Sequence, residues 1–222
     1  MHSARPSETL SRWCSALLCL ALGVAFIWGA WRQTSGFDVW TFEGRRQMQV
    51  AAGELRAPVV TLRHADGSDA PAPWHADSAA PAAYLVDFIY TRCPGLCRAL
   101  GSEYQQMQRQ LIVRGHHDPA YRGVQLLSVS FDVVHDGVPQ LQHAAAQWGA
   151  QEVHWRFAVP ASKADSRSLL RSLGVVAIPD GAGGFVHNGD IHLLDRQGRL
   201  RGLFGFDEWP RALAAARELT AR

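Results

Sequence analysis

A run of apolar residues leads directly into a pair of cysteines, and this arrangement most constrains how the chain can fold. The run spans Tyr84–Tyr90 and predicts a buried strand, because it is short and apolar. Cys93 and Cys97 follow it closely. Cysteines placed at the end of a buried strand are typical of α/β proteins with redox or metal chemistry. The sequence therefore predicts an α/β domain whose chemistry lies where this strand ends.

The cysteine spacing is CxxxC, one residue longer than the redox CxxC motif. If the chain is helical from Pro94 onward, the two side chains project from the same side with Cβ atoms about 5–6 Å apart. Thiolates so placed can hold one soft metal ion, or can close a disulfide, which needs Cα atoms roughly 4.4–6.8 Å apart. Pro94 suits the first position of a helix, whose positive end, with Arg92 and Arg98, favours the thiolate form of Cys93. The pair predicts copper binding, redox chemistry or both.

Strands and helices alternate along the rest of the chain. Strands are predicted at Pro58–Leu62, Tyr84–Tyr90, Val124–Phe131, Trp155–Val159, Ile191–Leu194 and Leu200–Phe204. Helices are predicted at Pro94–Arg114, Val138–Trp148, Ala164–Leu173 and Trp209–Thr220. This alternation predicts an α/β fold with a parallel component, and the hairpin of the last two strands adds an antiparallel edge. With the cysteine pair, the predicted fold class is thioredoxin-like, a central mixed β-sheet flanked by helices.

The N-terminal region predicts a membrane anchor. The segment Trp13–Trp31 carries no charge and is mostly apolar, and about 20 such residues span a bilayer as a helix. Arg5 and Arg12 precede it, which favours a cytoplasmic N-terminus. The alternative is a cleaved signal peptide, but no clean small-x-small site precedes Trp31. We expect a cytoplasmic N-terminus (1–12), a transmembrane anchor (13–31), a juxtamembrane connector (32–56) with a turn at Glu43–Arg46, and an exported domain (57–222).

Composition and the positions of the cysteines limit the kinds of protein that this chain can be. The hydrophobic content of 47% and the charged content of 19% are typical of a globular protein. A formal net charge of +2 without a dense basic stretch argues against nucleic-acid binding. Cys14 and Cys19 lie in the apolar segment and are expected to behave as small hydrophobic residues. Cys93 and Cys97 are then the thiols of the exported region. Because that compartment is expected to be oxidising, the pair must either be kept reduced by another protein or take part in redox chemistry itself.

A third ligand is expected to be a histidine. Two thiolates with one imidazole suit copper, whereas structural zinc usually takes four protein ligands. Of the 10 histidines, His135, His187 and His192 are the candidates. His187 stands out because it follows the glycine-rich segment Ile178–Gly184 and precedes a predicted strand, and loops at strand ends often carry function.

Three segments resemble, in order, the motifs of the Sco/SenC family of copper-binding cytochrome c oxidase assembly proteins. The first is Val86–Cys97, which contains the CxxxC pair. The second is Leu127–Asp132 with Asp136, similar to the DxxxD segment of the family. The third is Phe185–Gly198, similar to its histidine segment. The resemblance covers roughly residues 55–206.

Position by position, this resemblance implies that Cys93, Cys97 and His187 bind copper. His192 falls where the family has a strand residue and is not counted as a ligand. His135 lies inside the DxxxD segment and is a candidate accessory ligand. Asp132 and Asp136 are expected to form turns or to be solvated, because carboxylates are hard ligands and Cu(I) is soft.

The resemblance implies a membrane-anchored copper metallochaperone in the inner (cytoplasmic) membrane, with its domain on the periplasmic side. Its expected partners are the copper-bearing subunit of cytochrome c oxidase and other copper chaperones or thiol reductants. It would deliver copper to the dinuclear copper site or prepare the thiols of that site. The alternative is an enzyme, a thiol–disulfide oxidoreductase using Cys93 and Cys97. A peroxidase of the peroxiredoxin type is disfavoured, because Val86 and Tyr90 occupy the proline and threonine positions of its PxxxTxxC pattern.

Overall fold

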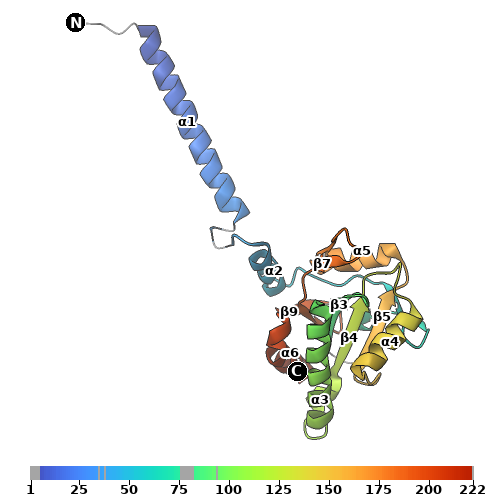
Figure 1. The fold of residues 1–222 in the computed structure, drawn as a ribbon. Helices are drawn as coiled ribbons and strands as arrows, with labels where there is room; N and C mark the ends of the chain where they lie inside the picture. The colour runs from blue at the N-terminus through green and yellow to red at the C-terminus, as the bar shows by residue number, and fades with distance from the viewer. Residues whose placement is uncertain (1–5, 35, 38, 76–82, 94, 222) are drawn as a thin grey trace. The chain divides into compact units, whose positions relative to one another are not determined.

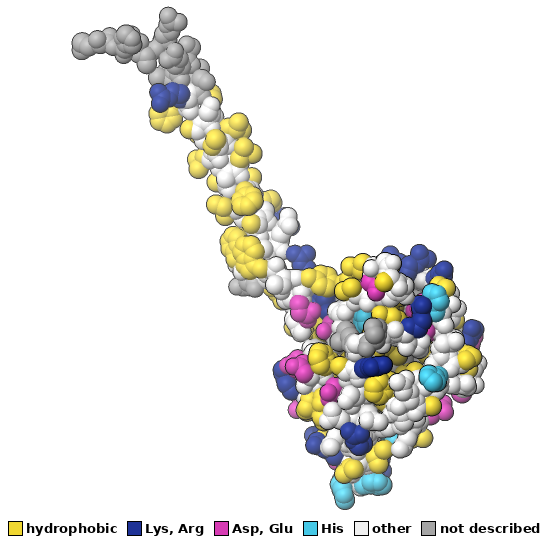
Figure 2. Space-filling model, viewed as in Figure 1, with side chains coloured by type: hydrophobic (Ala, Val, Ile, Leu, Met, Phe, Trp, Pro, Cys, Tyr) yellow, Lys and Arg dark blue, Asp and Glu magenta, His cyan; other side chains and the backbone are white. Residues whose placement is uncertain are grey.

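The computed structural model describes residues 6–34, 36–37, 39–75, 83–93 and 95–221 of the chain. These residues form two compact units, Met1–Arg46 and Gln47–Arg222, which we describe separately. The first unit consists mainly of helix α1 (Pro6–Gln33). Its part Arg12–Gln33 has a mean hydropathy of 2.0 and none of it is buried, and Figure 2 shows apolar side chains along its length. This helix is long and apolar enough to cross a membrane and contains the predicted span Trp13–Trp31.

Helix α2 (Phe42–Ala51) lies within the segment expected to be a connector. The turn predicted at Glu43–Arg46 is wrong, because these residues are helical. The Thr41 hydroxyl accepts a hydrogen bond from the Gly44 amide at 2.9 Å, which satisfies one of the free amides of the first turn. This N-cap starts a helix despite the glycine inside its first turn.

The second unit is built around a mixed seven-stranded sheet with the order β2-β1-β5-β4-β3-β8-β9 (Figure 1). Its strands are β1 (Thr61–His64), β2 (Asp69–Pro71), β3 (Ala83–Ile89), β4 (Val124–Ser130), β5 (Trp155–Pro160), β8 (Ile191–Asp195) and β9 (Leu200–Phe204). Strands β3, β4 and β5 are parallel, whereas β8 runs antiparallel to both β3 and β9. The predicted parallel core and antiparallel terminal hairpin are confirmed. A second antiparallel edge, formed by β1 against β5, was not predicted.

Helices cover both faces of this sheet. They are α3 (Leu96–Gly115), α4 (Val138–Trp148), α5 (Lys163–Ser172) and α6 (Trp209–Thr220), with short 3₁₀ turns at Pro73–His75, Pro119–Gly123 and Phe206–Glu208. The first strand begins at Thr61 rather than Pro58. The predicted start of α3 at Pro94 lies outside the described residues, and the described helix begins at Leu96. A separate two-stranded hairpin, β6 (Ala177–Pro179) with β7 (Phe185–His187), was not predicted as strands.

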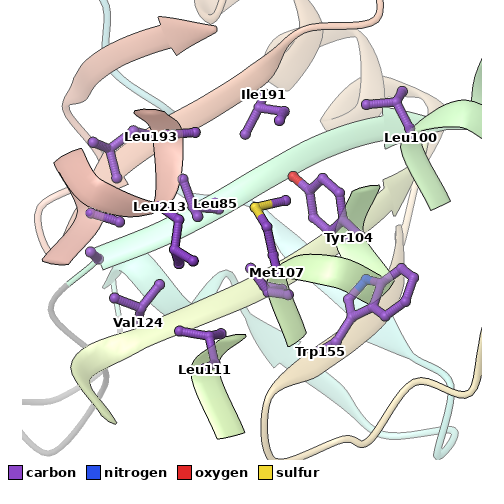
Figure 3. Close-up of a cluster of buried hydrophobic side chains, with 14 of the residues drawn as sticks. Leu85, Leu100, Tyr104, Met107, Leu111, Val124, Trp155, Ile191, Leu193 and Leu213 are labelled. Atoms are coloured by element: carbon purple, nitrogen blue, oxygen red, sulfur yellow. The ribbon is translucent and has the colours of Figure 1, made fainter. Parts of the chain in front are cut away.

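Two apolar clusters hold the helices to the sheet. Every residue of β3 is buried, and its side chains alternate between the clusters: Leu85 packs with α3, α4 and α6, and Val86 packs on the α5 side. Figure 3 shows Tyr104 and Met107 of α3 packed in the first cluster, beside Leu85 and Trp155. A strand buried on both faces must be almost entirely apolar, which is why Tyr84–Tyr90 was recognisable. Its end delivers the cysteine segment to one edge of the domain.

Candidate metal centre

The structure brings the three predicted ligands together from two separate segments. Cys93 and Cys97 follow β3, and His187 is the last residue of β7. The potential ligand atoms of these residues all lie within 4.8 Å of one another. The Cys97 Sγ and His187 Nε2 atoms are 3.8 Å apart. Among the described residues, this is the group of three that could hold a metal ion, and all three side chains are partly buried.

Cys93 lies two residues before Gly95, the N-cap of helix α3, and its sulfur contacts the first turn of that helix. The Cys97 amide donates a hydrogen bond to the Cys93 sulfur at 3.3 Å. This amide belongs to the first turn, where N–H groups have no partner inside the helix. The Cys93 sulfur therefore takes the place of a capping side chain, and the helix start sets the relative position of the two sulfurs.

Asp136 anchors the residues that precede Cys93. Its carboxylate accepts hydrogen bonds from the Thr91 amide at 2.8 Å and from the hydroxyls of Thr91 and Ser130, both at 2.6 Å. Asp136 was expected to form a turn or to be solvated: its amide closes the turn onto the Asp132 backbone oxygen at 2.9 Å, and the residue is only 4% exposed, so it is not solvated. The reason is that three donors from two neighbouring strand ends replace water around the carboxylate.

Asp132 forms the turn that was expected but is also buried, at 4% exposure. Its backbone oxygen accepts from the amides of His135 at 3.1 Å and Asp136 at 2.9 Å. Its carboxylate lies 2.9 Å from His135 Nδ1 and 3.0 Å from Arg92. Burial opposes ionisation, but the hydrogen bonds from His135 and Arg92 prevail and lower the pKa of Asp132 from its ordinary value. His135 is thus placed against Asp132 and outside the group of three.

The His187 ring presents one nitrogen to the cysteines. Its Nδ1 atom lies 3.1 Å from the backbone oxygen of Asn188. A carbonyl oxygen can only accept, so Nδ1 carries the proton in this contact and Nε2 retains its lone pair. Burial lowers the pKa of His187, which favours the neutral imidazole that binds metals. The ring also packs edge-on against Tyr90 and Phe131, with centroids 5.9 and 5.3 Å away.

Cys97 packs against both apolar clusters, whereas Cys93 packs against one of them. Burial is the main cause that raises its pKa above the ordinary value, and the neighbouring Cys93 side chain adds to it. When no metal ion is bound, burial therefore favours the neutral thiol of Cys97. A metal ion between the ligands supplies the positive charge that favours the thiolate, so binding a metal here is coupled to releasing a proton.

A cavity of about 280 Å³ is lined by both cysteines and, among others, by Asp87, Trp148 and Trp155. Asp87 was not singled out from the sequence, although an acid inside an otherwise apolar strand is a signal that could have been used. Its side chain is 1% exposed, and its Oδ1 has no hydrogen-bond partner among the described residues. Burial raises the pKa of Asp87 to about 7, which a hydrogen bond from Ser128 only partly offsets.

His192 lies away from the three ligands, as the resemblance implied. It is fully buried in β8, where its ring meets the edge of Phe88 at a centroid distance of 5.1 Å. Its Nδ1 atom is 3.1 Å from the backbone oxygen of Asp190. These contacts are those of a core histidine.

The fold and site together define a class: thioredoxin-like proteins with a CxxxC pair and a histidine that converge on one potential metal site. Within this class the chain belongs to the SCO1/SenC family, whose family model matches residues 72–221. The predicted family is confirmed.

Relatives agree with this assignment. A SCO1 protein homolog of Bacillus subtilis (strain 168) is 24% identical over 119 residues, which cover 53% of this chain and 58% of the relative. The chain thus spans little more than half the length of this curated relative. The structure of Bradyrhizobium japonicum ScoI with copper bound has a TM-score of 0.59 at 20% identity, covering 74% of this chain and 99% of that one. BsSco, described as a member of the Sco family of cytochrome c oxidase assembly proteins with a disulfide switch, has a TM-score of 0.62 at 19% identity, covering 75% of this chain and 94% of that one. These two likenesses show the fold, which is the thioredoxin-like one predicted.

Proposed function

We propose that this chain is a membrane-anchored copper metallochaperone for cytochrome c oxidase assembly, with Cys93, Cys97 and His187 as its copper ligands. The observation that carries the proposal is the convergence of these three ligand atoms within 4.8 Å, across 90 residues of sequence between Cys97 and His187. Membership of the SCO1/SenC family and the copper bound to solved relatives support it.

The donor set fits Cu(I) as the cargo. Two sulfurs and one neutral imidazole are soft or intermediate ligands, and three protein ligands are fewer than structural zinc usually takes. All three side chains are partly buried, which would shield the ion from bulk water and still leave the site accessible to a receiving protein. A site of this kind holds copper and can release it by stepwise exchange of ligands.

The place of action follows from the N-terminal helix and the family. Helix α1 is proposed to anchor the chain in the inner (cytoplasmic) membrane, with residues 33–222 on the periplasmic side. The proposed recipient is the copper-bearing subunit of cytochrome c oxidase, because a solved relative is described as an assembly protein of that enzyme. Other copper chaperones or thiol reductants would load or reduce the site.

A second function is favoured by the contact between the two cysteines. Cys93 and Cys97 are free thiols four residues apart in sequence, and the Cys97 amide donates a hydrogen bond to the Cys93 sulfur. Such a dithiol can pass two electrons and two protons to a client disulfide and become a disulfide itself. This reaction would prepare the cysteines of the dinuclear copper site to receive copper.

The copper proposal is tested by an anaerobic Cu(I) titration of the reduced full-length chain in detergent. We expect one tightly held copper per chain and a loss of affinity of more than about 10-fold in His187→Ala, since even the outer hydrogen-bond partners of metal ligands matter on this scale. His143→Ala, on the exposed face of α4, is the matched control. Equal affinity in all three proteins would contradict the proposed site. In cells, deletion should lower oxidase activity, and added copper should partly restore it.

A further inference from the structure

One hydroxyl connects the two segments that carry the ligands. The Phe185 amide donates a hydrogen bond to Tyr90 Oη at 3.3 Å, and Tyr90 Oη donates to the Phe185 backbone oxygen at 3.4 Å. Phe185 begins the strand that ends at His187. On the other side, the Cys93 amide donates to the Tyr90 backbone oxygen at 3.1 Å. Tyr90 therefore holds the backbone beside one ligand and the strand of another.

The ring of Tyr90 reinforces these contacts. Tyr90 is 3% exposed. It meets Phe185 edge-on at 5.3 Å between centroids and His187 at 5.9 Å. Phe131 closes the same aromatic group, at 5.7 Å from Tyr90 and 5.2 Å from Phe185. The hydroxyl is thus held in place by packing that does not depend on it.

The hairpin that carries His187 needs such a tie. Strands β6 and β7 form a two-stranded sheet of their own, apart from the seven-stranded sheet, and isolated hairpins are marginally stable. Gly184 permits the approach of the tyrosine, because a Cβ atom there would lie 3.0 Å from Tyr90 Oη and 2.6 Å from an Asp180 oxygen. The absence of a side chain at Gly184 therefore makes room for the hydrogen bonds between Tyr90 and Phe185.

We propose that Tyr90 is a positioning residue of the metal centre, whose hydroxyl fastens the β6–β7 hairpin so that His187 faces the cysteines before any metal binds. This inference rests on the proposed function, because it assigns His187 the role of third ligand. A ligand held in its binding position loses less freedom on binding, which raises affinity without a new contact to the ion. Tyr90 itself is not counted among the ligands.

The test compares Tyr90→Phe with Tyr84→Phe in the full-length protein. Both substitutions remove one hydroxyl from a buried tyrosine at or near β3, and Tyr84 Oη donates to the Pro73 backbone oxygen at 3.0 Å, away from the ligands. In the metal-free protein we expect the Phe185 amide to exchange with solvent about 10-fold faster in Tyr90→Phe only. Cu(I) affinity, measured by competition with a chelator, should fall about 3- to 10-fold, the range expected for one net hydrogen bond.

A double substitution separates positioning from other effects. If Tyr90 acts through His187, Tyr90→Phe should not weaken copper binding further when His187→Ala is already present. An equal loss in that background overturns the proposal, and so does a Phe185 exchange rate that matches the Tyr84→Phe control. Suppose that the Phe185 amide exchanges faster in Tyr90→Phe but that His187→Ala binds Cu(I) as tightly as the parent. This result would support the hydrogen bonds between Tyr90 and the hairpin but refute the three-ligand site. Gly184→Ala tests the same contact from the hairpin side, because its Cβ atom would crowd Tyr90 Oη, and it should also speed hydrogen exchange of the Phe185 amide.

Discussion

The Asp136 carboxylate accepts hydrogen bonds from both the backbone amide and the hydroxyl of Thr91, at 2.8 and 2.6 Å. Thr91 stands two residues before Cys93, and Asp136 belongs to the turn that follows β4. This contact fixes the start of the cysteine segment to a neighbouring strand of the parallel sheet. Two sets of hydrogen bonds therefore hold the site in place. Asp136 binds Thr91 in the cysteine segment, and Tyr90 binds Phe185 in the hairpin that carries His187.

Asp136→Asn should weaken both the fold and the metal site. The substitution replaces a carboxylate that accepts three hydrogen bonds by an amide that places an NH₂ group against some of the same donors. Loss of a buried, charge-assisted contact of this kind costs about 1–3 kcal/mol of unfolding free energy. Denaturant unfolding should show this loss, and chelator competition should show weaker Cu(I) binding.

Asp207→Asn is the control for this prediction, because Asp207 is exposed. It should change the unfolding free energy by less than about 0.5 kcal/mol. If Asp136→Asn behaves in the same way, the carboxylate does not anchor the cysteine segment.

Asp87 should make stability fall as pH rises through neutrality. Its pKa is raised from 3.8 to about 7 by burial, so the folded protein binds this proton more tightly than the unfolded chain. The contribution is fully present below about pH 3.8 and is lost as pH rises through about 7, with a slope of at most about 1.4 kcal/mol per pH unit. Asp87→Asn removes this dependence, so its unfolding free energy relative to the parent should increase between about pH 5 and pH 8.

Asp118→Asn is the matched control for the pH experiment. A hydrogen bond from Arg217 lowers the pKa of Asp118, so this carboxylate stays ionised in both states across the same pH range. The difference in unfolding free energy between Asp118→Asn and the parent should be flat there. A flat curve for Asp87→Asn as well would mean that Asp87 is ionised in the folded protein.

Elements with clear local signals were predictable from the sequence. The bounds of α4, Val138–Trp148, agree with the prediction, because Pro139 lies in the first turn and Gly149 follows the last residue in the left-handed conformation, with φ of 62°. Strand β3 was predictable from its apolar run. Convergence of Cys93, Cys97 and His187 was implied by the family resemblance, not by the spacing of these residues.

Features that depend on tertiary contacts were not predictable in this way. The hairpin strands β6 and β7 are three residues long and flank a glycine-rich segment, so their local sequence indicates a loop. The burial of Asp136 could not be read from its local sequence, because its three donors lie on Thr91 and Ser130, and only the parallel register of β3 with β4 brings those residues together. The same holds for the hydroxyl of Tyr90, whose partner is 95 residues away in sequence.

Gly101→Ala should destabilise the packing of α3 against α4. A Cβ atom at this position would lie 2.4 Å from the indole of Trp148, far inside contact distance. Alanine favours a helix by about 1 kcal/mol over glycine, but overpacking of this kind costs about 1–3 kcal/mol. We therefore expect a net loss in thermal unfolding experiments, which Trp148→Phe should partly relieve in the double variant. A more stable Gly101→Ala protein would show that Trp148 moves aside freely.

Bound copper should protect the thiols of Cys93 and Cys97 from oxidation by glutathione disulfide only when His187 is present. The dithiol of Cys93 and Cys97 is expected to reduce glutathione disulfide, forming an intramolecular disulfide and two molecules of glutathione. His187 lies 3.8 Å from Cys97 Sγ but takes no part in that electron transfer, so His187→Ala should react within about 2-fold of the parent rate when metal is absent.

Under a chelator concentration at which the parent retains one Cu(I), the parent should react more than about 10-fold more slowly, because metal-bound thiolates are withdrawn from exchange. His187→Ala should show little protection under these conditions, and Cys93→Ser should show neither copper binding nor disulfide formation. The rates are measured by following glutathione release. Equal protection of the parent and His187→Ala would mean that the cysteines hold copper without the histidine, and it would contradict the proposed three-ligand site.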